Sequence, residues 1–150
     1  MELTYESMLR WMKEYFNAYN AYAQNPKTVQ KMCDYFAPDM VYHPYITELG
    51  KPVTNRADFL RILSGHPAGY EVFKVDDIAI DERKKVVTAL LKAEIYDSKT
   101  RKLRLAKEYI PRYQLGLDEN NTIKIKSIDF FWEDLEPGML DVSDVFLGRK

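Results

Sequence analysis

Residues 123–133 of the chain read IKIKSIDFFWE, and this stretch decides how the second half of the sequence is interpreted. Apolar and polar side chains alternate along it, which is the pattern of a β-strand with one buried face. Asp129 stands among its aromatic residues. An acid among aromatic residues is either exposed on the surface of a curved strand or part of a pocket. The elements that surround the strand decide between these two positions.

Three more long strands precede this one, at about 70–80, 85–96 and 102–117, and the last strand spans about 122–134. Only short polar turns separate consecutive strands, so we expect an antiparallel sheet. Pro111 removes a ladder hydrogen bond from the third of them and predicts a bulge or an edge position there.

The first half of the chain predicts three helices and one strand. Apolar residues recur at helical spacing over 5–23, with Thr4 as the cap. Asn25-Pro26 begins a second helix, 39–46 forms a short strand, and Asn55 caps a third helix. The expected fold is therefore α+β, with the helices and one early strand followed by a curved antiparallel sheet, in a single domain over residues 1–150.

Composition excludes several classes of partner. The formal net charge is −1 with acids and bases interspersed, which argues against nucleic acid and anionic membranes as partners. No apolar run approaches the roughly 20 residues that span a bilayer, and residues 1–4 lack the features of a signal peptide, so we expect a cytoplasmic protein. Cys33 is the single cysteine and is interpreted as a small buried hydrophobe rather than a nucleophile.

Familiar cofactor motifs do not occur in the sequence. There is no glycine-rich phosphate loop, serine elbow or paired cysteine motif. His43 and His66 lie far apart and lack spaced acids, which makes a metal site a poor interpretation, and His66 is read as a turn residue. Any catalysis is therefore expected to need neither cofactor nor metal.

The last residues of the chain, 136–150, are rich in apolar side chains. We expect them to fold back over the sheet, to close a pocket mouth or to dock on a second subunit. The apolar residues concerned are Met139, Leu140, Val142, Val145, Phe146 and Leu147.

The segment YFAPDMVYHP at 35–44, the aromatic first helix, the Asn-Pro start of the second and the final FWE at 131–133 together resemble the nuclear transport factor 2-like superfamily, and most of all its SnoaL-like proteins. The resemblance covers about residues 5–135. It implies a cone, in which a strongly bent sheet wraps the first helix around a cavity. In this superfamily the cavity serves isomerases, dehydratases, polyketide cyclases and epoxide hydrolases, or the domain only binds a partner protein.

The tail is also similar, more weakly, to the lid segment of scytalone dehydratase, which implies that it covers the cavity. The paired histidines of that enzyme have no counterpart here. Glu71, Phe73, Lys107 and Tyr109 stand on the matching strands, which argues against dehydratase chemistry of that kind.

Strand alternation assigns residues to faces of the sheet. In the last strand Ile123, Ile125, Ser127, Asp129 and Phe131 share one side by this count. Lys107 is likewise the polar exception on the apolar side of its strand, and a charge there must be paired, neutralised or at a pocket mouth. Lys107 and Asp129 therefore form a structural ion pair, or Asp129 faces the cavity as a general acid or base.

The functional hypothesis is a cone that binds a small apolar or aromatic molecule, as a homodimer formed through the outer face of the sheet. If the protein is an enzyme, we expect an isomerase, cyclase or dehydratase (an isomerase or lyase) with His43 and Asp129 exchanging a proton, although a lone histidine is also often structural. The alternative is a non-catalytic module for ligand sensing or protein–protein interaction. The residues predicted to bind the ligand are Tyr15, Tyr19, Tyr42, Lys107, Tyr109 and Trp132.

Overall fold

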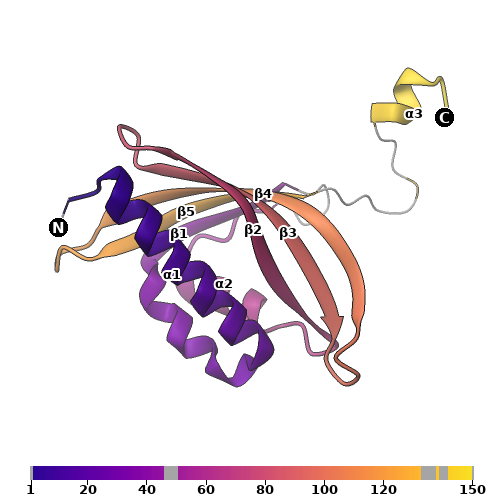
Figure 1. Ribbon diagram of the computed structural model, residues 1–150, viewed down its shortest axis with the longest axis horizontal. Coiled ribbons are helices and arrows are strands. Elements are labelled where there is room, and N and C mark those ends of the chain that lie inside the picture. Colours follow the sequence, from indigo (N-terminus) through magenta and orange to yellow (C-terminus); the bar gives the residue numbers. More distant parts are fainter. Residues whose placement is uncertain (1, 46–50, 133–137, 139–141, 150) are drawn as a thin grey trace.

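The computed structural model of the protein describes residues 2–45, 51–132, 138 and 142–149 and has the expected α+β architecture. The helices of the first half of the chain gather on the concave side of a curved sheet, and the first of them lies across it (Figure 1). The elements in chain order are α1 (Tyr5–Gln24), the 3₁₀ helix η1 (Pro26–Tyr35), β1 (Phe36–Tyr45), α2 (Arg56–Leu63), β2 (Gly69–Asp81), β3 (Val86–Asp97), β4 (Leu103–Leu117), β5 (Ile123–Trp132) and α3 (Val142–Phe146).

The sheet has the strand order β1-β5-β4-β3-β2, and β2 to β5 form the predicted antiparallel meander. The prediction of an entirely antiparallel sheet is wrong at one edge, because β1 pairs with β5 in parallel. Tight turns dictate antiparallel pairing only between consecutive strands, and β1 and β5 are far apart in the chain. Residue 46, which the sequence placed in the early strand, lies outside the described residues.

The prediction for Pro111 is also wrong. Pro111 is fully buried, and its strand β4 is a central strand of the sheet, so it is not at an edge. The register of β4 with β3 is the same before and after Pro111, because Tyr109 pairs with Leu91 and Arg112 with Thr88, so no residue is inserted there. The irregularity of β4 against β5 lies further on, after Gln114.

Helix α1 presents its aromatic stripe to the concave face and is fixed at both ends. Thr4 forms the predicted cap, and Ser7 completes a capping box with it. Near the other end, the Asn20 side-chain amide donates to the Phe73 carbonyl oxygen and its oxygen accepts from the Phe73 N–H, both at 2.8 Å. Asn20 thus pairs with the free edge of β2 as a neighbouring strand would, and this holds α1 against β2.

Strand β5 contains a bulge that reverses the face assignment of its second half. Gln114 pairs with Ser127, whereas Leu115 pairs with Ile125, so Lys126 is an extra residue on β5. Ile123 and Ile125 are buried as predicted, but Ile128 is buried too. The predicted common side of Ile125 and Asp129 is therefore wrong, because one inserted residue shifts the alternation by one position.

The C-terminal helix α3 lies apart from the sheet (Figure 1). Its apolar side chains are exposed, Phe146 at 83%. The predictions that the tail folds back over the sheet or closes the mouth of the pocket are therefore wrong for its described part. Met139 and Leu140 lie outside the described residues. Docking of the tail on a second subunit stays a prediction.

Candidate functional site

A cavity of about 520 Å³ lies between α1, α2 and the concave face of the sheet. This volume is within the usual range of small-molecule sites. Most of its wall is apolar or aromatic, with Phe59 and Leu63 from α2 and Phe73, Phe130 and Trp132 from the sheet. The cone is thus hollow rather than filled by its own aromatic side chains.

Glu71 is the only acid among the described residues that line this cavity. It stands on β2 two residues before the buried Phe73, and alternation turns both side chains to the concave face. The Tyr19 hydroxyl donates to Glu71 Oε1 at 3.0 Å, and Tyr109 donates a second hydrogen bond. Burial nevertheless raises the pKa of Glu71, because it outweighs these two hydrogen bonds, which favour the carboxylate.

Ring packing fixes the two tyrosines that hold Glu71. Tyr19 stacks on Phe73 with ring centroids 4.5 Å apart, and Tyr109 meets the edge of Phe130 at 5.2 Å. Burial raises the pKa of Tyr19 far above its ordinary value, and the charge of Glu71 adds to the effect, so Tyr19 remains a hydrogen-bond donor.

A second polar group lies deeper in the cavity. Tyr113 donates a hydrogen bond to the Tyr15 hydroxyl, and Tyr42 is close enough to raise the pKa of both Tyr15 and Tyr113. Burial is the main reason why the pKa values of Tyr15, Tyr42 and Tyr113 are raised. These hydroxyls therefore stay protonated. Because Tyr113 donates its hydrogen bond to Tyr15, the hydroxyls of Tyr15 and Tyr42 are the ones that can donate to an oxygen atom of a bound molecule.

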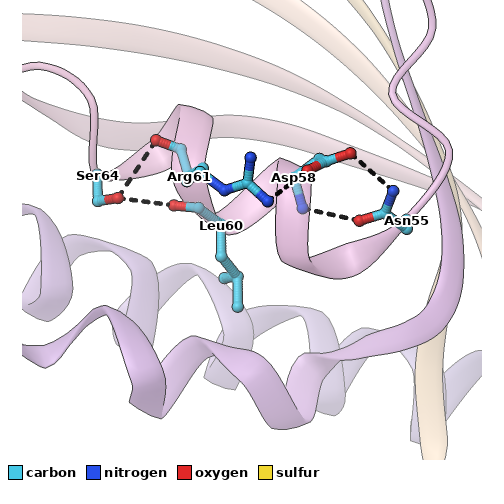
Figure 2. Close-up of polar contacts among 5 residues, drawn as sticks. All are labelled: Asn55, Asp58, Leu60, Arg61 and Ser64. Carbon is cyan, nitrogen blue, oxygen red and sulfur yellow. Dashed lines mark hydrogen bonds and ion pairs between the residues drawn. The ribbon is translucent and has the colours of Figure 1, made fainter.

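Helix α2 forms one wall of the cavity. Hydrogen bonds and an ion pair at its two ends stabilise this short helix (Figure 2). Asn55 accepts from the Asp58 N–H at 2.8 Å and its amide donates to the Asp58 carboxylate, while Arg61 pairs with the same carboxylate at 2.7 Å. At the other end Ser64 Oγ donates to the Leu60 carbonyl oxygen. The predicted cap at Asn55 is confirmed, and Phe59 and Leu63 are held facing the cavity.

The rim of the cavity carries basic side chains. Lys51 and His66 are exposed and line it, together with the exposed Pro26, Ile62 and Ser64. The sequence predicts only a turn residue at His66, because its loop position does not indicate that the end of α2 lies beside the cavity.

Five of the six residues predicted to bind a ligand line the cavity, namely Tyr15, Tyr19, Tyr42, Tyr109 and Trp132. Lys107 does not appear among the described lining residues, although it shares the face of Tyr109. Their role in binding stays a prediction. The sequence analysis predicts no role in the cavity for Glu71, although Glu71 and Phe73 are two residues apart on one strand and therefore point to the same face.

The two predicted catalytic residues lie next to each other but on the opposite face of the sheet. His43 is opposite Asp129 in the register of β1 and β5, while the neighbouring Tyr42 and Phe130 line the cavity. His43 stacks on Tyr45, with ring centroids 4.0 Å apart. The inward face predicted for Asp129 is wrong, because the bulge at Lys126 shifts the alternation of β5, and His43 lies on the outer face beside it.

The predicted partner of Asp129 is also different. Arg112 is opposite Asp129 in register and its Nη1 lies 3.4 Å from Asp129 Oδ2, so the ion pair forms with Arg112 rather than with Lys107. The Tyr45 hydroxyl donates to Asp129 Oδ1 at 3.4 Å. Asp129 is therefore part of a polar and aromatic group on the outer face.

Within the described ranges, no cluster of three or more histidine, cysteine, aspartate or glutamate side chains could hold a metal ion. In the same part of the chain, every helix is too short or too polar to cross a bilayer.

Comparisons with solved structures identify the fold. AusH from Aspergillus nidulans has a TM-score of 0.67 at 15% identity, over 98% of this chain and 99% of that one. Nuclear transport factor 2 from Cryptosporidium parvum has a TM-score of 0.66 at 9% identity, over 89% and 98%. SalBIII, an epoxide hydrolase/cyclase-like enzyme with a role in pyran ring formation in salinomycin, has a TM-score of 0.59 at 16% identity, over 85% and 92%.

The chain has the nuclear transport factor 2-like fold that its sequence resembles. Proteins of this fold include cyclases and hydrolases as well as proteins of unknown function, so the fold does not specify an activity. No protein-family model matches the sequence. No curated protein matches it either.

Proposed function

We propose that the protein binds a small apolar or aromatic molecule in the cavity and that Glu71 moves a proton at this molecule without a cofactor. The reaction class is an isomerase, cyclase or dehydratase. The observation that carries the proposal is the Glu71 carboxyl, held by Tyr19 and Tyr109 in a cavity whose other walls are largely apolar.

The surroundings of Glu71 suit proton transfer. Burial raises the pKa of its carboxyl toward the range in which a group can both accept and return a proton near neutral pH. The hydroxyls of Tyr15 and Tyr42 border the same space. Negative charge that develops on a substrate oxygen is stabilised by such protonated donors in a site shielded from water.

The chemistry in its simplest form is removal of a proton from a carbon next to a carbonyl group. The Glu71 carboxylate takes the proton, the electron pair moves into the carbonyl to give an enolate, and a tyrosine hydroxyl donates a hydrogen bond to the enolate oxygen. Return of the proton from the Glu71 carboxylic acid to a carbon completes the cycle, so no oxidant or co-reactant is needed. SalBIII, a cyclase-like enzyme on the same fold, is consistent with this class of reaction.

The catalytic roles predicted for His43 and Asp129 stay predictions. Both residues lie on the face of the sheet opposite the cavity, so Glu71 takes their place in this proposal.

The proposal is tested with 2-tetralone, an aromatic ketone with acidic protons beside its carbonyl group. Exchange of these protons in deuterated buffer is followed by NMR. We expect the wild-type protein to accelerate the exchange and Glu71→Gln to lose about 10²–10⁴ of the acceleration. Glu108→Gln, which changes an exposed acid of β4, is the matched control and should exchange at the wild-type rate.

Two other outcomes are informative. If the exchange continues in Glu71→Gln but is lost in Asp129→Asn, Asp129 on the outer face is the catalytic residue and the proposal for Glu71 is wrong. Binding of 2-tetralone, measured by quenching of Trp132 fluorescence in a Trp11→Phe background, without any exchange would support the alternative of a non-catalytic ligand sensor.

We also propose a homodimer formed through the outer face of the sheet. Apolar side chains are exposed there on four strands, at Val41, Tyr45, Leu90, Ile110 and Phe131. Phe131 contacts Tyr45 and lies opposite Ile110 in register, and exposed apolar side chains that adjoin in this way are typical of protein interfaces. Ile110→Lys places a charge in the middle of this face and should halve the mass measured by light scattering, and an unchanged mass would exclude this face as the interface.

A further inference from the structure

The exposed rim and the interior of the cavity differ in charge. Lys51 and His66 supply the ionisable side chains of the rim among the described residues, and both are basic. The interior holds Glu71 and the tyrosine hydroxyls. A molecule that fills the cavity therefore has its apolar part against aromatic rings and its outer end beside cationic or hydrogen-bond-donating groups.

The position of Lys51 follows from the backbone around it. Val53 forms a bridge with Tyr42 of β1, in which the N–H of each residue donates to the carbonyl oxygen of the other at 2.8 Å. Val53 and Lys51 both line the cavity, and Pro52 between them does not. Lys51 lies two residues before the bridged Val53, so the bridge to β1 holds the segment that carries Lys51 beside the rim.

His66 reaches the rim from the other end of α2. The helix ends at Leu63, whose carbonyl oxygen accepts from the Tyr22 hydroxyl, and Ser64 caps it by donating to the Leu60 carbonyl oxygen. These bonds fix the end of α2, so the loop that carries His66 starts from a defined point beside the cavity. The imidazole ring supplies a further N–H donor at the rim.

From this distribution we infer that the ligand is an amphiphilic acid, whose apolar or aromatic body fills the cavity and whose carboxylate or other anionic group lies at the rim beside Lys51 and His66. The inference rests on the proposed function and narrows its ligand class. Proton transfer at Glu71 then takes place on the buried part of the ligand, away from its charged end.

The interior does not oppose an anionic ligand. The only acid among the described lining residues is Glu71, and burial disfavours its charged form, which raises its pKa. The charged rim also leaves the anionic group in contact with water, so its hydration is largely kept. An anion buried in the interior would instead lose its hydration at a cost of several kcal/mol.

The test compares matched acids and amides with the same apolar body, 2-naphthoate with 2-naphthamide and octanoate with octanamide, by isothermal titration calorimetry. We expect each acid to bind about fivefold more tightly than its amide at low salt, the effect of one favourable exposed charge pair. The preference should shrink as ionic strength rises, because exposed pairs are screened. Lys51→Gln should remove most of it, and Lys84→Gln, in the distant β2–β3 turn, should leave it unchanged.

Each result decides between the two proposals. If acids and amides bind equally, or if the preference for acids survives in Lys51→Gln, the amphiphilic acid is excluded while binding in the cavity stands. If none of the four probes binds, both the proposed cavity function and this inference are contradicted.

Discussion

Replacing Glu71 by Gln is expected to change how the stability of the protein depends on pH. Burial raises the pKa of folded Glu71 above the value of about 4.3 that a glutamate has in an unfolded chain. Between these two pKa values the folded state binds more protons than the unfolded state, so stability falls as pH rises through the window. The stabilising effect is complete below the unfolded value and is lost above the folded one.

The size of the effect follows from the single proton involved. One group contributes at most about 1.4 kcal/mol per pH unit within the window. Glutamine carries no such proton, and its amide oxygen can still accept the hydrogen bond that Tyr19 donates to Glu71 Oε1. The stability of Glu71→Gln relative to the wild type should therefore be lowest near pH 4, rise with a slope of up to about 1.4 kcal/mol per pH unit and then level off.

The assay is urea denaturation of both proteins at pH steps of about one unit between about 4 and 8. Glu82→Gln, in the exposed turn between β2 and β3, is the control and should give a difference from wild type that does not change with pH. A constant difference for Glu71→Gln over the whole range, or one that falls with pH, would refute the conclusion that burial dominates the environment of Glu71.

Three further predictions concern faces, caps and ion pairs. Leu91→Ala should lower the free energy of unfolding, measured in urea, by about 2–5 kcal/mol because Leu91 is fully buried. Leu90→Ala, on the other face of the same strand, should change it by less than about 0.5 kcal/mol. Equal losses in the two variants would contradict the face assignment. Asn55→Ala removes the acceptor of the Asp58 N–H and should cost about 1 kcal/mol in the same assay, and unchanged stability would show that α2 does not depend on its cap. Asp129→Asn breaks a partly exposed pair and should cost less than about 1 kcal/mol at low salt and less still at high salt, so a large, salt-independent loss would be inconsistent with an outer-face position.

Local patterns predicted much of the fold. The apolar spacing of α1 and its Thr4 cap depend on residues within a few positions of each other, and both are confirmed. The apolar face of β3 is confirmed as well, because Val87 and Leu91 are fully buried and the strand has no inserted residue. The second helix is less regular than predicted, since η1 is a 3₁₀ helix with a kink at Thr28.

Properties that depend on distant parts of the chain were harder to predict. The parallel pairing of β1 with β5 joins segments separated by more than half of the sequence. The partner of Asp129 depends on the register of β4 and β5, which set Arg112 rather than Lys107 opposite it. Counting alternate residues cannot detect an inserted one, so the assignment of Ser127, Asp129 and Phe131 to the side of Ile125 is reversed.

The aromatic residues of the cavity were easier to identify than its acid. Tyr15 and Tyr19 follow from the stripe of α1, and Tyr109 from the apolar side of its strand, so their helix and strand faces were enough. Glu71 lies on the edge strand β2, where a glutamate between apolar residues is ordinarily read as solvent-exposed. Contacts of α1 with β2 made across the fold, by Asn20 and by Tyr19 stacking on Phe73, bring Tyr19 within hydrogen-bonding distance of it.

The bulge at Lys126 gives this strand an unusual sensitivity to changes in length. Deleting one residue there would turn Asp129 and Phe131 into the cavity and move Phe130 and Trp132 to the outer face, without any substitution in the rest of the strand. A single insertion or deletion could in this way exchange an aromatic wall for a carboxylate during evolution. On this scaffold the chemistry of the cavity is therefore open to change by the length of a strand as well as by the identity of its residues.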